Sequence, residues 1–218
     1  MNDPHDNQAT SKKSNTTLWV MIILFALPNL AAFYFYFNRD NIDFSRFTSN
    51  HGTIISPVRQ VADITLTRID DAPLQMSSLK GKWLMVSIGS SSCQQDCQDN
   101  LYKMRQIRKA TGEFFKRVDR LLLLTDTTDI DSFRSLLSEG YSKLTVVIPP
   151  QGTDTKADGS AELYSRFLSG FSIEGEPVED GIYFIDPLGN YMMAFPPQTE
   201  AKKILKDLMR LLDVSQIG

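Results

Sequence analysis

Residues 81–97, GKWLMVSIGSSSCQQDC, decide how the rest of this chain is interpreted. The apolar run at residues 83–88 has the length and the β-forming side chains of a buried strand, and Gly89 ends it. Three serines follow, and they suit a tight turn and a helix N-cap. The only two cysteines of the chain, Cys93 and Cys97, come next, and a helix-forming stretch follows them. The sequence therefore predicts two thiols at the point where a strand passes into a helix.

The position of the two cysteines favours chemistry at sulfur. Unpaired N–H groups and the helix dipole at a helix start favour an anion, so they lower a thiol pKa and supply thiolate. A spacing of four residues would put both side chains on one face of the first helical turn, where they could close a small disulfide or hold one soft metal ion. The alternative is two buried, inert core residues, as free cysteines often are. The polar residues between the cysteines, QQD, favour the functional interpretation.

Composition limits the class of protein. A chain of 218 residues that is 42% hydrophobic can bury one core and carry an appendage. The net charge is −3 and the charged residues are interspersed, so the sequence predicts no nucleic-acid partner. It contains no internal repeat, no phosphate-binding Walker loop and no dinucleotide-binding glycine motif. A cysteine pair is typical of an oxidising compartment, where it can cycle or be structural.

The N-terminal part predicts a membrane anchor. Residues 1–17 are polar and are predicted to form a disordered tail, whereas residues 18–37 are uncharged and meet the requirement of about 20 residues for crossing a bilayer. A cleaved signal peptide is the alternative, but the run is long for one and no small-residue cleavage site follows it. Lys12 and Lys13 precede the span and acidic residues follow it. The positive-inside rule therefore predicts a cytoplasmic N-terminus and, in a bacterial inner membrane, a periplasmic remainder.

Residues 38–59 are predicted to be a linker, and residues 60–218 to be one domain. The predicted strands cover residues 61–68, 83–88, 120–125, 144–148, 182–186 and 191–195. Predicted helices follow the cysteines and cover residues 126–139, 161–168 and 199–212. The order βαβα, then a hairpin and a helix, predicts an α/β fold with a mixed sheet and helices on both faces. A thiol pair after the first core strand of such a sheet is the arrangement of a thioredoxin-like domain.

Three features together resemble the Sco/SenC family of cytochrome oxidase assembly proteins: the anchor, the CxxxC pair in LKGKWLMVSIGSSSC, and the late hairpin IYFIDPLGNY. The resemblance covers about residues 60–212. It implies that the two cysteines and one later histidine bind copper, and that the domain matures a copper site by metal delivery or thiol reduction. Cys93 and Cys97 match the two thiol positions, so they are the implied catalytic and metal-binding residues. The implied partner is a respiratory oxidase subunit or another membrane or periplasmic protein.

The family histidine has no counterpart here. The interval before residue 182 reads EPVEDG, and an alignment without gaps places the ligand at Val178. The two histidines of the chain, His5 and His51, lie before the span and in the predicted linker, where a histidine is more often solvated than a ligand. Soft Cu(I) accepts two thiolates, whereas Cu(II) prefers imidazole, which Glu179 or Asp180 would replace poorly.

Three functions remain open from the sequence. The first is thiol–disulfide exchange, in which Cys93 is the more exposed thiolate that attacks a partner and Cys97 resolves the mixed disulfide. Asp96 would oppose this by raising the pKa of a neighbouring thiol. The second is a Cu(I) chaperone that uses the same two cysteines without the histidine. The third is a redox-inactive assembly scaffold in which a static disulfide braces the helix start.

Overall fold

The computed structural model describes residues 15–38, 50–138, 140–141, 143–152, 159–173 and 178–215. The chain divides into two compact units, residues 1–49 and residues 50–218. The first unit contains helix α1 (Thr16–Phe37), whose described side chains are almost all exposed. Among the described residues it is the one helix long and apolar enough to cross a membrane, as the sequence predicts for residues 18–37. Residues 1–14 of the expected tail lie outside the described residues.

The second unit is built on one sheet of eight strands in the order β1-β8-β7-β4-β5-β6-β2-β3. Strands β4, β5 and β6 are parallel, and the other pairings are antiparallel, so the predicted mixed sheet is confirmed. All seven residues of β4 are buried. This agrees with its sequence, because an apolar run without alternation is typical of a strand that is covered on both faces. The strands are β1 (Thr53–Gln60), β2 (Thr65–Arg68), β3 (Pro73–Gln75), β4 (Trp83–Gly89), β5 (Val118–Leu124), β6 (Thr145–Ile148), β7 (Ile182–Ile185) and β8 (Asn190–Phe195).

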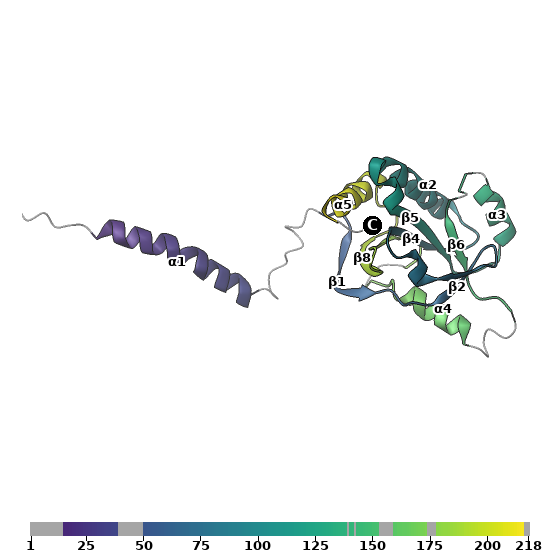
Figure 1. Ribbon diagram of the computed structural model, residues 1–218, viewed down its shortest axis with the longest axis horizontal. Coiled ribbons are helices and arrows are strands. Elements are labelled where there is room, and N and C mark those ends of the chain that lie inside the picture. Colours follow the sequence, from purple (N-terminus) through teal and green to yellow (C-terminus); the bar gives the residue numbers. More distant parts are fainter. Residues whose placement is uncertain are drawn as a thin grey trace, which may run out of the picture. The chain divides into compact units, whose positions relative to one another are not determined.

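Helices cover both faces of the sheet, as Figure 1 shows. Helix α4 packs on one face, where Tyr164 and Phe167 join the core that contains Leu84 and Val86 of β4. The alternate side chains of the strands face the other layer, which contains α2, α3 and α5. The helices are η2 (Met76–Leu79), α2 (Gln95–Ala110), η3 (Gly112–Arg117), α3 (Ile130–Ser138), α4 (Ser160–Ser169) and α5 (Ala201–Val214).

The expectation of a linker over residues 38–59 is wrong in its second part, because β1 forms there and pairs with β8. The backbone N–H groups of His51 and Gly52 donate to the Asp207 carboxylate at 2.6 and 3.0 Å. Only Ile55 of β1 is buried, so this strand lacks the alternating pattern by which a strand is recognised in a sequence. Residues 39–49 of the expected linker lie outside the described residues.

The strand register brings three segments together at one edge of the sheet. Gly89 at the end of β4 lies opposite Leu124 at the end of β5, so the loops that follow these strands begin side by side. The Thr125 N–H donates to the Gly89 carbonyl at 2.9 Å, and the Asp180 N–H donates to the Ile88 carbonyl at 2.8 Å. The cysteines lie in the first of these segments.

Candidate functional site

The two cysteines form a disulfide at this edge of the sheet. Their sulfur atoms are 2.01 Å apart and their Cα atoms 5.0 Å apart. After Gly89 the chain turns sharply, and the Cys93 N–H donates to the Ser90 carbonyl at 3.1 Å. The strand-to-helix connection therefore positions both sulfur atoms just beyond the end of β4.

The helix starts later than the spacing of the cysteines suggests. Helix α2 begins at Gln95, so Cys97 lies in its first turn and Cys93 lies before it. Cys93 has a φ of 34°, in the left-handed region, which costs a residue with a Cβ about 1–2 kcal/mol. The expectation that both side chains share one face of the first turn is therefore wrong. The cause is the tight turn, which reverses the chain at Cys93 before the helix can begin.

The serines stabilise this turn instead of capping the helix. The buried Ser91 hydroxyl donates to the Asp126 carboxylate at 2.5 Å and accepts from the Asp129 N–H at 3.0 Å. Burial would raise the pKa of Asp126, but hydrogen bonds from Ser90, Ser91 and the Thr128 N–H outweigh it and lower the pKa to about 2. Asp126 is thus a fixed anion that ties the cysteine turn to the loop after β5. Its only signal in the sequence is its place directly after the second buried strand.

Both sulfur-bearing residues are largely buried. Cys93 is 3% exposed and Cys97 is 7% exposed, so the expected greater exposure of Cys93 is not found. They pack beside Leu101, Leu122 and Phe133 in an apolar cluster. On their other side lies a pocket of about 270 Å³, through which a reagent can approach the disulfide. Its lining consists of Ser90, Ser92, Cys93, Gln94, Gln95, Asp96, Cys97, Glu179 and Asp180.

Asp180 comes from another segment and lines the same pocket as the disulfide. Its carbonyl accepts from the Asn100 side chain at 2.6 Å, which joins it to α2. A Cβ built on Gly89 would lie 3.6 Å from the Asp180 carboxylate and 3.9 Å from the Cys97 sulfur. Burial, followed by the charges of Glu179 and Asp96, raises the pKa of Asp180. Sequence reasoning considered Asp180 only as a poor metal ligand and missed this position.

The described residues do not complete a three-ligand copper site. Among them, no group of three or more His, Cys, Asp and Glu side chains is arranged to hold a metal ion. The Nδ1 atom of His51 lies 3.1 Å from the Asp207 carboxylate of α5, so this histidine is held away from the disulfide. The Val178 carbonyl accepts from the Tyr183 hydroxyl at 2.6 Å, and its side chain packs against the core. Among the described residues, the ligands that suit copper at this site are the two sulfur atoms, which fit Cu(I) once they are reduced to thiolates.

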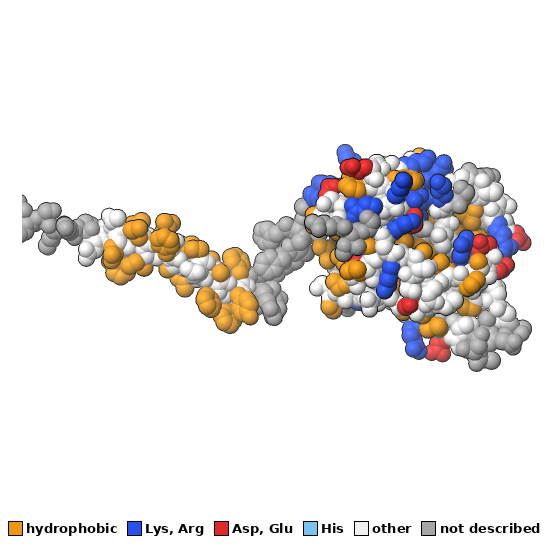
Figure 2. All heavy atoms as spheres, viewed as in Figure 1, with side chains coloured by type: hydrophobic (Ala, Val, Ile, Leu, Met, Phe, Trp, Pro, Cys, Tyr) orange, Lys and Arg blue, Asp and Glu red, His pale blue; other side chains and the backbone are white. Residues whose placement is uncertain are grey.

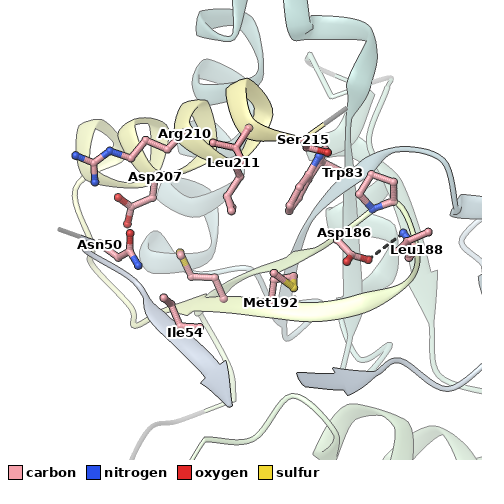
Figure 3. Close-up of a pocket in the computed structure, with 13 residues that line it drawn as sticks. Asn50, Ile54, Trp83, Asp186, Leu188, Met192, Asp207, Arg210, Leu211 and Ser215 are labelled. Atoms are coloured by element: carbon pink, nitrogen blue, oxygen red, sulfur yellow. Dashed lines mark hydrogen bonds between the residues drawn. The ribbon is translucent and has the colours of Figure 1, made fainter. Parts of the chain in front are cut away.

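A larger pocket in the described part of the domain lies elsewhere. It measures about 400 Å³ and lies between α5 and β8, with Trp83, Met192 and Leu211 in its lining (Figure 3). Trp83 begins β4, whereas the disulfide follows the other end of that strand. This apolar pocket is therefore separate from the sulfur site.

Several solved structures with a similar fold are Sco proteins. Copper-bound ScoI of Arabidopsis thaliana is 14% identical and has a TM-score of 0.55, with 72% of this chain and 100% of that chain covered. A SCO1/SenC family lipoprotein of Bacillus anthracis is 18% identical, with a TM-score of 0.52 and coverage of 72% and 99%. BsSco, described with a disulfide switch, is 14% identical, with a TM-score of 0.54 and coverage of 75% and 99%. The predicted Sco-like, thioredoxin-like fold is therefore confirmed.

Sequence comparison gives the family. A search of curated proteins found no match. A family model described as the transmembrane-like, thioredoxin-like C-terminal domain matches residues 83–165 and 172–215, which is more than half of the chain. This match includes the cysteine turn, the helix after it and the late hairpin. The chain therefore belongs to the family of transmembrane-like, thioredoxin-like C-terminal domains.

Proposed function

We propose that this protein is a membrane-anchored thiol–disulfide oxidoreductase whose working group is the Cys93–Cys97 pair. One observation carries the proposal: a disulfide between cysteines four positions apart lies at the end of the central strand and lines an open pocket. A thioredoxin-like domain with a disulfide in this position is suited to exchange with a second protein. We further propose that the exchange assists the assembly of a cytochrome c oxidase, at its copper site.

The exchange takes two steps. In the reduced protein the Cys93 thiolate attacks one sulfur of the partner's disulfide, which forms a mixed disulfide and releases one partner thiolate. The Cys97 thiolate then attacks Cys93 in that mixed disulfide, which releases the second partner thiolate and restores the Cys93–Cys97 bond. The partner disulfide gains two electrons, and this protein loses two. Cys93 is assigned the attack because it lies in the turn, whereas Cys97 is fixed in the first turn of α2.

The surroundings of the pair supply opposing electrostatic effects. The unpaired N–H groups at the start of α2 favour a thiolate at Cys97, whereas the carboxylates of Asp96 and Glu179 oppose it. Asp180, whose pKa is raised, is the proposed acceptor of the proton that the Cys97 thiol loses before it resolves the mixed disulfide.

The cellular setting is proposed from α1 and from the relatives. BsSco is described as a member of a family of cytochrome c oxidase assembly proteins, which supports an oxidase subunit or a neighbouring membrane protein as the partner. Helix α1 is proposed to be an uncleaved anchor in a bacterial inner membrane. The lysines that precede it support a cytoplasmic N-terminus and a periplasmic domain at residues 60–218, together with the edge strand β1.

Trapping the mixed disulfide tests the proposal. The full chain in nanodiscs, as Cys97→Ser, is expected to form a stable mixed disulfide with a disulfide-bonded peptide through Cys93. The Cys93→Ser variant should form much less of it, and the double variant none. A Cys93–Cys97 bond that stays oxidised in buffers poised below about −300 mV would contradict exchange and leave the static scaffold.

Copper binding is the second candidate, because ScoI of Arabidopsis thaliana and ScoI of Bradyrhizobium japonicum are described with copper bound. In this chain the cargo would be Cu(I) on the thiolates of Cys93 and Cys97, without a histidine. Titration of the reduced full chain against a Cu(I) chelator is expected to give one equivalent of bound copper, which either Cys→Ser variant abolishes. No binding in competition would remove this candidate and leave the exchange proposal unaffected.

A further inference from the structure

Arg120 is a buried arginine, and two of its guanidinium nitrogens have no acceptor among the described residues. It is the third residue of β5, at the end of this strand that lies away from the disulfide, and it is 6% exposed. Its Nε and Nη1 atoms are fully buried, and no described residue accepts a hydrogen bond from them. Burying a charged donor without an acceptor is costly, so such a group calls for an acceptor, and a bound anion is one that suits a guanidinium.

Arg120 lies in the wall of a pocket of about 250 Å³ that is strongly basic. The lining residues are Arg105, Arg108, Lys109, Phe115, Arg120, Gly140 and Lys143. Five of the seven are cationic and none is acidic. Lys and Arg side chains gather along the upper edge of the domain in Figure 2, where Figure 1 draws α2.

Aromatic rings hold two of the other guanidinium groups in fixed orientations. The Arg108 guanidinium lies 4.0 Å from the Phe115 ring centroid, and that of Arg105 lies 5.8 Å from the Tyr141 ring centroid. A guanidinium stacked on a ring loses little conformational freedom on binding. Arg108 is fixed further, because its Nε donates to the Val118 carbonyl and its Nη2 donates to the Asp119 carboxylate.

The carboxylate of Asp119, the residue before Arg120, already pairs with two other cations. Asp119 accepts from Arg108 at 3.0 Å and from Lys82 at 2.8 Å, so two cations already share it. Burial, followed by the positive charges of Arg108 and Arg105, lowers the pKa of Arg120, and Tyr141 and Asp119 offset part of this effect.

We propose that this pocket binds a phosphate group, with Arg120 as its buried anchor and Arg105 and Arg108 as flanking donors. A guanidinium can donate two parallel hydrogen bonds to two phosphate oxygens. A phosphate dianion also neutralises more of the five positive charges in this pocket than a carboxylate, which carries one negative charge. The group can belong to a soluble phosphate compound or to a lipid headgroup with a terminal phosphate, because the recognition chemistry is the same.

Calorimetric titration of the full chain in phosphatidylcholine nanodiscs with inorganic phosphate tests the site. Saturable binding is expected, with acetate at equal ionic strength binding more weakly. Arg120→Gln should weaken phosphate binding by about tenfold or more, the loss expected for one charged hydrogen bond. Arg166→Gln is the matched control, because it removes the same charge from an exposed position on α4 and should leave the affinity unchanged.

A second variant and a second lipid composition complete the test. Arg105→Gln, from a half-buried position, carries the same prediction if Arg120→Gln fails to fold by circular dichroism. Phosphatidic acid in the nanodiscs should lower the apparent phosphate affinity if a lipid headgroup is the ligand, and leave it unchanged if the ligand is soluble. Absence of phosphate binding, or equal losses in Arg120→Gln and Arg166→Gln, would overturn the proposal.

Discussion

Reducing the Cys93–Cys97 bond should lower the stability of the domain only slightly. The bond closes a loop with a sequence separation of four residues, among the shortest that a disulfide can close. In the chain-entropy model, a loop of about five residues contributes about 2 kcal/mol to the free energy of unfolding. The reduced thiols stay in the same apolar cluster, where a cysteine behaves as a small hydrophobic residue and adds no further cost.

The expected change is measurable by thermal unfolding. For a domain of this size, about 2 kcal/mol corresponds to a decrease of about 4–8 °C in Tm. The assay compares the oxidised full chain with the same chain in a non-thiol reductant, followed by near-UV circular dichroism in nanodiscs. The Cys93→Ser/Cys97→Ser double variant should match the reduced protein and should not respond to reductant.

Two results would refute this reasoning. A decrease of more than about 15 °C would mean that the bond holds the fold together, as a structural brace does. No decrease at all would mean that the turn is already fixed by its hydrogen bonds to Asp126, with the disulfide adding nothing. The first outcome would count against a bond that opens and closes during function at modest cost, and the second would refute the magnitude taken from the chain-entropy model.

Three further predictions concern carboxylates. The pKa of Asp180 is higher in the folded protein than its ordinary value of 3.8. Its ionisation therefore lowers the stability of the fold as the pH rises from 3.8 through the folded-state pKa. In urea unfolding, Asp180→Asn should match the wild type at pH 3.5 and be more stable than the wild type at pH 7. The pKa of Asp126 is lowered from 3.8 to about 2, so its contribution to the stability of the fold is present above pH 3.8 and is lost as the pH falls toward 2. Asp126→Asn should lack this acid-dependent loss of stability. A pH profile of stability like that of the wild type would contradict the role of Asp126 as a fixed anion. Asp207→Ala should cost about 2–4 kcal/mol in urea unfolding, because it leaves two backbone donors at the start of β1 without their acceptor. Asp213→Ala, an exposed position on the same helix, is its control and should change stability by less than about 0.5 kcal/mol.

The sequence predicts the centre of the fold because that part carries local signals. The apolar run at residues 83–88 becomes β4 with one residue added, and the late hairpin appears at β7 and β8. Strand β1 is not predicted from the sequence because only one of its residues is buried. Strand β3 is not predicted because it has three residues and begins with Pro73. Both strands depend on pairing with distant partners, which no local pattern reveals.

The candidate site divides in the same way. The spacing of Cys93 and Cys97 is local and leads directly to the sulfur pair, whereas the turn at Cys93 follows from the Ser91–Asp126 contact across 35 positions. Asp180 reaches the disulfide only because β7 pairs with β4. Arg120 precedes a run of four leucines and gives no sign in the sequence of the basic residues that the fold gathers around it.

Helix α2 has one further consequence, because it joins two chemically different places. Cys97 lies in its first turn, and Arg105 and Arg108 lie near its end, so one rod of 16 residues, about 24 Å long, contributes to both the disulfide and the basic pocket. If opening the disulfide shifts helix α2, the affinity for phosphate changes. Thermodynamic linkage then requires that bound phosphate changes the free energy of reducing the disulfide by the same amount. The fraction of the protein in the reduced state would then depend on both the redox potential and the concentration of the anion.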